Sequence, residues 1–268
     1  DTTTLTLTLV DFNRDGSLDV ITGDDTGELT LYANDRSASL FDSTANVTIT
    51  SGLSDIQGLA SGDFDRDGVV DLIASGSGGA ILFFGVISSD GYGVSAGEVL
   101  SSSGGGSGAV TVGDIDRDGD EDLVIARRSA TNLLWLNDGT SSPFLGVSPS
   151  ALDSTADDST SVSLADVDVD GDIDVIVTNS DAVNRVYLTS VATDATVTFT
   201  AVAVNDPVDS STSSALASID NRGRPDLVVG NTNGRLQVFT TPFLDGTLPD
   251  AQCAMACPVV PLSCDDAL

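Results

Sequence analysis

The stretch DFDRDGVVDLI, residues 63–73, decides the fold of this chain. Its first nine positions contain four aspartates, and an apolar run follows at once. Carboxylates this close together repel one another, so the loop is either fully solvated or built around a positive charge. The apolar run that follows is typical of a β-strand that is covered on both faces.

The same pattern occurs five times at an almost constant spacing. The copies begin at residues 11, 63, 114, 166 and 218, which gives offsets of 52, 51, 52 and 52 residues. The first four copies read DFNRDGSLDVI, DFDRDGVVDLI, DIDRDGDEDLV and DVDVDGDIDVI. The fifth copy is degenerate and reads SIDNRGRPDLV. Such regular self-similarity predicts a chain of equal structural units that stack on one another.

Each unit shows the signals of four short strands. In the first unit these are LTLTLV before the acidic loop, DVITG after it, LTLYAN beyond a turn, and NVTIT at the end. Four antiparallel strands in about 52 residues, without helical periodicity, predict an all-β fold: a β-propeller of five four-stranded blades. A solenoid is the competing architecture, although it favours shorter repeats with capped ends. We assign residues 1–249 to the propeller and residues 250–268 to a separate tail.

The charge balance argues against several classes of function. The chain has 10 basic residues, all of them arginine, against 41 acidic ones, and its formal net charge is -31. This charge argues against nucleic acid or an anionic membrane as a partner and favours cations. Histidine and lysine do not occur in the sequence, so the commonest general base and the Schiff-base amine are missing. We therefore expect that the protein is not an enzyme. We also expect no membrane insertion, because no apolar run approaches the roughly 20 residues that span a bilayer.

The acidic loops have the composition of a calcium site. Each intact copy reads D-x-[DN]-x-D-G-x-x-D, so the side chains at positions 1, 3, 5 and 9 and the main-chain carbonyl of position 7 can surround one ion. Glycine at position 6 permits the bend that this cage needs. Magnesium prefers a smaller octahedron that keeps several waters, so calcium fits better. The alternative interpretation is a set of solvated Asp-Gly turns, which four evenly spaced copies argue against.

The motif assigns ligands in four loops and predicts the loss of the fifth site. In the fifth copy, Ser218 replaces the first aspartate and Arg222 replaces the ligand at position 5. The guanidinium of Arg222 either stands where the ion would lie, paired with Asp220 and Asp226, or points to solvent. We therefore expect about four calcium ions. The predicted ligands are Asp11, Asn13, Asp15, Ser17 and Asp19 in the first loop; Asp63, Asp65, Asp67, Val69 and Asp71 in the second; Asp114, Asp116, Asp118, Asp120 and Asp122 in the third; and Asp166, Asp168, Asp170, Asp172 and Asp174 in the fourth.

The tail and one sequon carry further signals. All three cysteines, Cys253, Cys257 and Cys264, lie in the last sixteen residues. Their odd number indicates either a pairing partner in a disulfide-rich module or another subunit, or one free thiol. Asn46 begins the sequon Asn-Val-Thr, a candidate N-glycosylation site if the protein is secreted.

The loops also resemble those of a known family. Aspartate-rich loops between the first and second strands, followed by a segment such as NLLWLNDGTSSPF at residues 132–144, resemble FG-GAP and VCBS repeats, the blades of integrin α-subunit propellers. The resemblance implies a calcium-bearing propeller outside the cell that serves in adhesion, recognition or scaffolding. Integrin-type propellers have seven blades of longer repeats, so five copies predict either a five-bladed ring or part of a seven-bladed one. The last repeat lacks a clear fourth strand at residues 241–250, so closure would borrow a strand from the N-terminus or another subunit.

Three classes of function follow. The leading one is a non-catalytic, extracellular calcium-binding building block or adhesion module, including a subunit of a filament or surface appendage. Its partners would be other protein subunits, copies of itself or surface glycans. The second is a receptor head that recognises a protein or glycan, for which Tyr92 and Phe144 are the candidate exposed aromatics, whereas Trp135 is expected in a strand core. The third is a polysaccharide-active enzyme that uses loop aspartates as acid and base.

Overall fold

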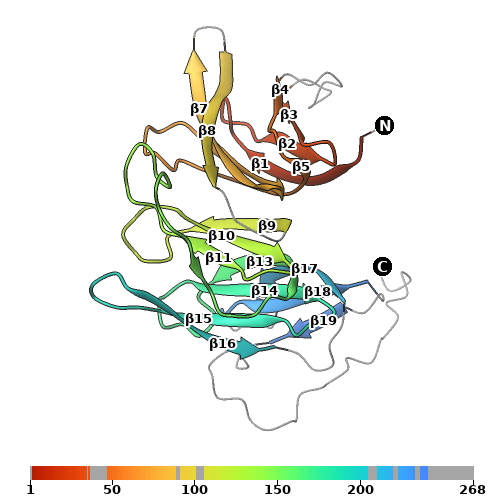
Figure 1. Cartoon of the computed structure of the whole chain (residues 1–268), viewed down its shortest axis with the longest axis vertical. Helices are drawn as coiled ribbons and strands as arrows, with labels where there is room; N and C mark the ends of the chain where they lie inside the picture. The colour runs from red at the N-terminus through yellow and green to blue at the C-terminus, as the bar shows by residue number, and fades with distance from the viewer. Residues whose placement is uncertain are drawn as a thin grey trace, which may run out of the picture.

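Every regular element in the described part of the chain is a β-strand. The computed structural model describes residues 2–34, 36, 47–88, 91–100, 106–204, 210–219, 223–232 and 236–240. The strands in these ranges pair with antiparallel neighbours in short hairpins (Figure 1). The predicted all-β class is therefore confirmed.

The described strands form five successive units. Within each unit, strands that follow one another in the sequence are neighbours in the sheet. The third and fourth units share one sheet through a single pairing, Arg128 with Asp158. The first unit has β1 (Thr4–Val10), β2 (Asp19–Asp24), β3 (Glu28–Tyr32) and β4 (Val47–Thr50), and the second has β5 (Ser54–Gly62), β6 (Asp71–Ser77), β7 (Gly79–Ser88) and β8 (Gly91–Leu100). The third has β9 (Gly106–Gly113), β10 (Asp122–Arg128), β11 (Leu133–Trp135) and β12 (Ser150–Ala151), and the fourth has β13 (Asp158–Ala165), β14 (Asp174–Ser180), β15 (Arg185–Val191) and β16 (Val197–Ala203). The fifth has β17 (Ser211–Ala217), β18 (Asp226–Asn231) and β19 (Leu236–Phe239).

The units fan out in chain order around their first strands. Figure 1 shows the red first unit and the yellow second unit in the upper half, with the green, teal and blue units below them. First strands of successive units contact one another, from β1 to β5, β9, β13 and β17. Among the described strands, no comparable contact joins the fifth unit to the first. The described part of the molecule is therefore an open arc.

Apolar clusters fill the four junctions between successive units. One of them joins Phe12 and Ile21 of the first unit to Leu59 and Leu72 of the second, and the other three junctions repeat this arrangement. The second strand of each inner unit is covered on both faces, so β6, β10 and β14 are buried along nearly their whole length. This explains why the sequence of these strands is continuously apolar rather than alternating.

Several predictions concern residues outside the described ranges. They are the sequon at Asn46, the fifth-loop residues Asp220 and Arg222, the missing strand at residues 241–250, and the cysteine-containing tail. In the part of the chain that the structure does describe, no helix is long and apolar enough to cross a membrane.

Candidate metal sites

Each acidic loop joins the first strand of a unit to its second strand. The last aspartate of the motif is the first residue of that second strand in all five units, as with Asp71 in β6 and Asp122 in β10. The residue at position 2 points into the junction with the following unit, and its side chain is at most 2% exposed in the first four loops. The loop is thus fixed at both ends by the packed core.

Three of the loops bring carboxylates together. In each, the aspartates at positions 1, 3 and 9 offer oxygen atoms that all lie within 4.8 Å of one another. This donor set suits a hard cation such as calcium. The clusters are Asp63, Asp65 and Asp71 in the second loop, Asp114, Asp116 and Asp122 in the third, and Asp166, Asp168 and Asp174 in the fourth.

The aspartate at position 5 lies outside these clusters. Its carboxylate accepts a hydrogen bond from the main-chain N–H of position 7 in every intact loop. In the third loop, for example, Asp118 Oδ1 lies 2.9 Å from the nitrogen of Asp120. Asp15, Asp67 and Asp170 make the same contact with Ser17, Val69 and Asp172. Position 5 therefore holds the apex of the loop in this structure, in addition to its predicted role as a ligand.

The first loop differs from the other three in charge. As with Asp166 in the fourth loop, both carboxylate oxygens of Asp11 accept main-chain N–H groups, from Asp15 at 3.0 Å and Gly16 at 2.8 Å. Position 3 is Asn13, whose neutral amide oxygen also accepts the N–H of Asp15. With one carboxylate fewer, this loop offers a cation a weaker electrostatic field than the three clusters do.

The aspartate at position 9 has a structural role that sequence reasoning missed. One of its oxygens accepts the N–H of position 2, and the other accepts an N–H in, or just beyond, the third strand of the same unit. For Asp122 these donors are Ile115 at 2.7 Å and Asn137 at 2.9 Å. Asp19, Asp71 and Asp174 make the equivalent pairs of hydrogen bonds. This buried carboxylate ties the loop to two strands, with or without an ion.

Burial shifts the ionisation of the clustered carboxylates. It raises the pKa of Asp71 and Asp174 to about 6 and that of Asp122 to about 7. Hydrogen bonds to main-chain N–H groups oppose this rise, while neighbouring carboxylates, such as Asp116 beside Asp122, add to it. A divalent cation among these oxygens would remove the repulsion and favour the ionised forms. The residues present therefore fit a calcium ion.

The backbone of each loop is left-handed at two positions. Arg66 at position 4 has φ 58° and Gly68 at position 6 has φ 81°, and the other intact loops repeat this pair. Glycine adopts this conformation freely, whereas a side chain at position 4 makes it costly. Val169 occupies position 4 of the fourth loop with φ 66°, which is unfavourable for a β-branched residue.

Arginines at position 4 connect one loop to the next. Arg66 of the second loop forms an ion pair with Asp120 of the third, and Arg117 of the third pairs with Asp172 of the fourth at 2.6 Å. The guanidinium also covers the glycine of the next loop: a methyl group on Gly171 would lie 3.1 Å from Nη2 of Arg117. Each of these arginines therefore neutralises a carboxylate at position 7 of the neighbouring unit.

In the described part of the chain, the first and the fifth loops lack this ion pair with an arginine of the preceding loop. In the first loop the position over Gly16 is taken by Arg36 of the same unit, which bonds to the main chain of Asp15 and to Ser17 Oγ. At the other end, position 7 of the fifth loop is Arg224, and the preceding loop has the uncharged Val169 at position 4. Arg14 of the first loop likewise covers Gly68 of the second, but position 7 there is the uncharged Val69, so among the described residues the ion pair forms at two junctions.

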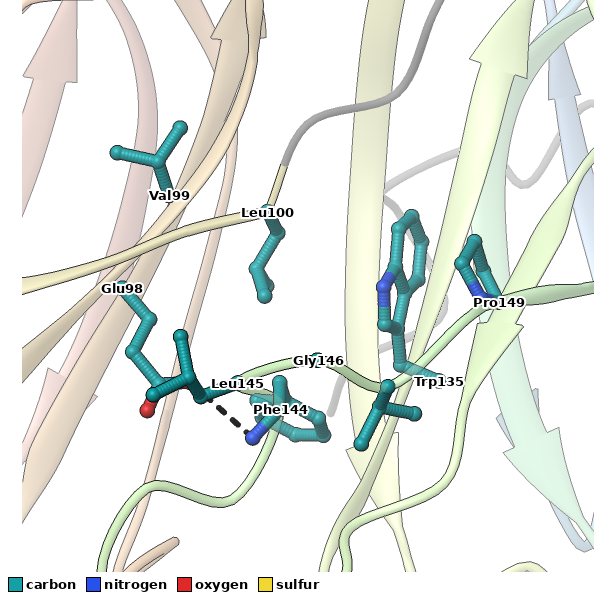
Figure 2. A pocket seen from close by; sticks show the side chains of 9 residues that line it. Glu98, Val99, Leu100, Trp135, Phe144, Leu145, Gly146 and Pro149 are labelled. Carbon is teal, nitrogen blue, oxygen red and sulfur yellow. Dashed lines mark hydrogen bonds between the residues drawn. The ribbon is translucent and has the colours of Figure 1, made fainter.

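A second candidate site is a hollow of about 230 Å³ between the second and third units. Figure 2 shows Leu100 and Trp135 on facing sides of it, with Glu98, Phe144 and Pro149 around them. Glu98 Oε2 accepts the N–H of Phe144 at 3.1 Å, and its buried Oε1 has no hydrogen-bond partner.

The aromatic candidates for an exposed recognition surface do not lie free on loops. The expectation for Phe144 is wrong: its side chain is 2% exposed, because the 143–146 turn folds it onto Phe64 with ring centroids 6.0 Å apart. Tyr92 is half-buried and packs edge-on against Phe12. Trp135 lies in the core, as predicted.

A fan of antiparallel sheets with an aspartate-rich loop between the first two strands of each defines this chain as a β-propeller protein rather than a solenoid. A family model described as "FG-GAP-like repeat" matches residues 11–74 and 114–177. These two matches cover just under half of the chain and support membership of the FG-GAP/VCBS repeat family of β-propellers. The predicted family is thereby confirmed.

Solved structures show the same fold at low sequence identity. One is BBS1N in complex with ARL6DN, with 12% identity, a TM-score of 0.50, and coverage of 88% of this chain and 78% of that chain. Another is an Agrocybe aegerita lectin in a structure on specific recognition of non-reducing terminal N-acetylglucosamine, with 16% identity, a TM-score of 0.52, and coverage of 89% of this chain and 66% of that chain. The chain thus spans about two thirds of that lectin. A comparison with curated proteins finds no match.

Proposed function

We propose that the protein is a non-catalytic, calcium-stabilised propeller module that serves outside the cell as a structural or adhesion unit. The observation that carries this proposal is the set of three carboxylate clusters, each with its oxygens within 4.8 Å, at the same place in successive units. A cation at each cluster would fix the loop between two strands, and these three ions, with a fourth in the first loop, would hold the arc rigid. Binding and ordering of the loops are then coupled.

The calcium assignment rests on the ligands and on the family. All the donors are oxygens, which calcium prefers, and FG-GAP-like repeats commonly bind it. Extracellular modules bind calcium with dissociation constants of roughly 0.1 to 1 mM, which matches the exterior of a cell rather than its cytosol. After four calcium ions the formal charge would be -31 plus 8, or -23, which keeps the surface hydrated.

The proposed module catalyses no reaction. The clustered aspartates each have a role in a cage or in a hydrogen-bonded loop, and the sequence has neither histidine nor lysine to act as a base. Incubation with a panel of polysaccharides is expected to release no reducing sugar. Release that depends on the clustered aspartates would contradict a purely structural role.

Calcium removal tests the proposal directly. Thermal unfolding in excess EDTA should occur at a melting temperature lower by ten degrees or more than in calcium, since each ion stabilises only the folded form. Titration calorimetry should give about four ions per chain. The variant Asp65→Asn, in the second cluster, should lose part of the calcium response, whereas Asp181→Asn, on an exposed turn, should not. Identical melting curves with and without calcium would refute the proposal.

Recognition of a glycan or protein is the second candidate. It is supported by the hollow beside Trp135, where the buried Oε1 of Glu98 has no hydrogen-bond partner and could accept one from a ligand. A glycan array in calcium, followed by the same array with Glu98→Gln, tests it. Binding that this substitution weakens would favour recognition at the hollow, and a blank array would argue against a glycan ligand.

A further inference from the structure

One arginine is buried inside the molecule without a charged partner. Arg127, near the end of β10, is 4% exposed. Its Nε and Nη2 atoms are buried and have no hydrogen-bond partner among the described residues. Its Nη1 atom lies 3.5 Å from the carbonyl oxygen of Thr131. Nε and Nη2 form the edge of the planar guanidinium that can bind an anion through two parallel N–H groups.

Five other arginines in the described part of the chain pair with aspartates. Each of these five side chains is between 22% and 59% exposed, so solvent screens much of its charge. Arg127 is more deeply buried than any of them, and no aspartate is paired with it among the described residues. The five paired residues are Arg36, Arg66, Arg117, Arg128 and Arg185.

Burial makes the charge of Arg127 costly. Burial lowers the pKa of its guanidinium, and no charged group in the described part of the chain contributes to this shift. Arginine nevertheless keeps its proton in proteins. A buried charge destabilises the fold unless an opposite charge accompanies it. A water molecule could accept the two hydrogen bonds but would leave the charge uncompensated, whereas an anion does both.

Arg127 lies at the junction between the second and third units. Leu123 and Ile125 precede it at alternate positions of β10 and pack in the apolar cluster of this junction, so Arg127 lies on the same face of the strand. The second unit contributes Ala80 to that cluster, and the hydroxyl of Ser75 donates to the main chain of β9. These side chains are small and uncharged, so they cannot balance the guanidinium.

The equivalent residue in the fourth and fifth units is a neutral asparagine. Arg127, Asn179 and Asn231 each lie five residues beyond position 9 of their loop, which is residue 122, 174 or 226. Each of the three pairs in register with a serine of the first strand of its unit. These serines are Ser107, Ser159 and Ser211.

The two asparagines are satisfied within the protein. Asn179 Oδ1 accepts the hydroxyl of Ser159 at 2.8 Å, and its Nδ2 donates to a main-chain carbonyl at 2.6 Å. Asn231 Oδ1 accepts the hydroxyl of Ser211 at 2.8 Å, and its Nδ2 donates to Gln237 at 3.0 Å. A residue that needs no ligand therefore fits this place in the repeat, whereas the third unit has a cation there.

We propose that Arg127 holds one small inorganic anion, such as chloride, at the junction between the second and third units. The anion accepts hydrogen bonds from Nε and Nη2 and balances the buried charge. Because both nitrogens are buried, the ion is enclosed as the two units pack, and a carboxylate of a ligand at the surface does not reach them. The net charge of -31 disfavours anions elsewhere on the molecule, so a single ion binds.

Thermal unfolding in two sodium salts tests the site on the full chain. Calcium is kept saturating and ionic strength constant while chloride replaces isethionate, an anion too large to be enclosed. Chloride at about ten times its dissociation constant should raise the melting temperature by roughly 2 to 4 °C, because the ion binds only the folded form. Arg127→Asn should abolish this rise and still fold, since asparagine fits the equivalent position of the fourth unit. Arg127→Met, which removes the charge, should melt in isethionate no lower than the unmodified protein.

Arg128→Asn is the matched control. It changes the adjacent arginine, which is exposed and already bonded to Gln57 and Asp158, so the response to chloride should remain. Equal melting temperatures of the unmodified protein in the two salts would overturn the proposal, as would a chloride response that persists in Arg127→Asn.

Crystallography in bromide locates the ion directly. A crystal grown in sodium bromide should show one anomalous peak at hydrogen-bonding distance from Nε and Nη2 of Arg127. Density for water alone at this place would refute the anion. The site is independent of the calcium proposal: if chloride has no effect but EDTA still lowers the melting temperature in isethionate, the calcium module stands and only the anion site is refuted.

Discussion

The fourth and fifth loops share a hydrogen-bonded frame but differ in charge. In the fourth loop, Val167 N–H donates to Asp174 and Gly171 N–H donates to Asp166. In the fifth, Ile219 N–H donates to Asp226 at 2.7 Å, and Gly223 N–H donates to the hydroxyl oxygen of Ser218 at 3.2 Å. The replacement of aspartate by serine at position 1 therefore keeps the hydrogen bond and loses the carboxylate.

This difference separates two roles within one motif. Positions 2, 6 and 9 build the loop and are retained in the fifth copy as Ile219, Gly223 and Asp226. Position 1 supplies charge as well as a hydrogen bond, and only the charge is lost there. The loop frame thus depends on hydrogen bonds and packing, while the ion site depends on the additional carboxylates.

The largest expected loss of stability comes from replacing the aspartate at position 9, in the fourth loop and in the fifth. Asp226→Ala and Asp174→Ala should each lower the free energy of unfolding in EDTA by about 3 kcal/mol, because buried N–H groups lose their acceptor. Urea unfolding without calcium measures this, with Asp181→Asn as the control. A fifth-loop variant as stable as the unmodified protein would show that Asp226 is a relic of an ion site rather than part of the frame.

A smaller loss of stability is expected when the aspartate at position 1 of the fourth loop is replaced by serine, the residue at that position of the fifth loop. Asp166→Ser should leave stability in EDTA within about 1 kcal/mol of the unmodified protein, since the hydroxyl can accept the N–H of Gly171. In calcium at ten times the dissociation constant, it should lose about 1.4 kcal/mol, the contribution of one ion. Calorimetry should show one ion fewer. An unchanged ion count would contradict the assignment of Asp166 as a ligand.

The arginine series predicts that a change in one loop acts on the next. Arg66→Gln should cost about 1 kcal/mol, because Asp120, which is 4% exposed, loses its ion-pair partner. Hydrogen exchange should increase at residues 114–122 and not at residues 63–71. Arg128→Gln, which removes an exposed ion pair with Asp158, is the control and should change neither loop. Faster exchange confined to the second loop would contradict a connection between units.

The smallest effect is expected at position 4 of the fourth loop. Val169→Asn should raise the free energy of unfolding by about 0.5 to 1 kcal/mol, since asparagine tolerates a φ of 66° better than a β-branched residue does. Val169 is 56% exposed, so little burial is lost. Val99 is an exposed valine in β8 without positive φ, so Val99→Asn is the control. It should not raise the free energy of unfolding measured with urea.

The repeat pattern predicted much of the fold. Because the acidic loop recurs every 51 or 52 residues between apolar runs, the strands before and after it could be placed from the sequence. The family, the all-β class and the position of each loop between two strands followed from the same pattern. The aspartates at positions 1, 3 and 9, which the structure brings together in three loops, were all among the predicted ligands.

Contacts between different repeats were not predictable in this way. The pairing of Arg66 with Asp120 joins two repeats, and the only signal for it in the sequence is that a basic position 4 precedes an acidic position 7 in the next copy. The burial of Phe144 was missed because the segment around it is polar and resembles an exposed turn. The hydrogen bonds of Asp122 with Ile115 and Asn137 were missed because an aspartate in a metal motif was interpreted only as a ligand.

The sequence by itself determined the unit of structure and its chemistry, since strand formation, the bend at each glycine and the density of carboxylates are local properties. Only the tertiary structure decided which faces of the units are covered and which are left open, because burial depends on neighbours that lie a full repeat away along the chain. The exposed Leu7 and the buried Leu59 occupy the same place in their repeats, and only their neighbours distinguish them.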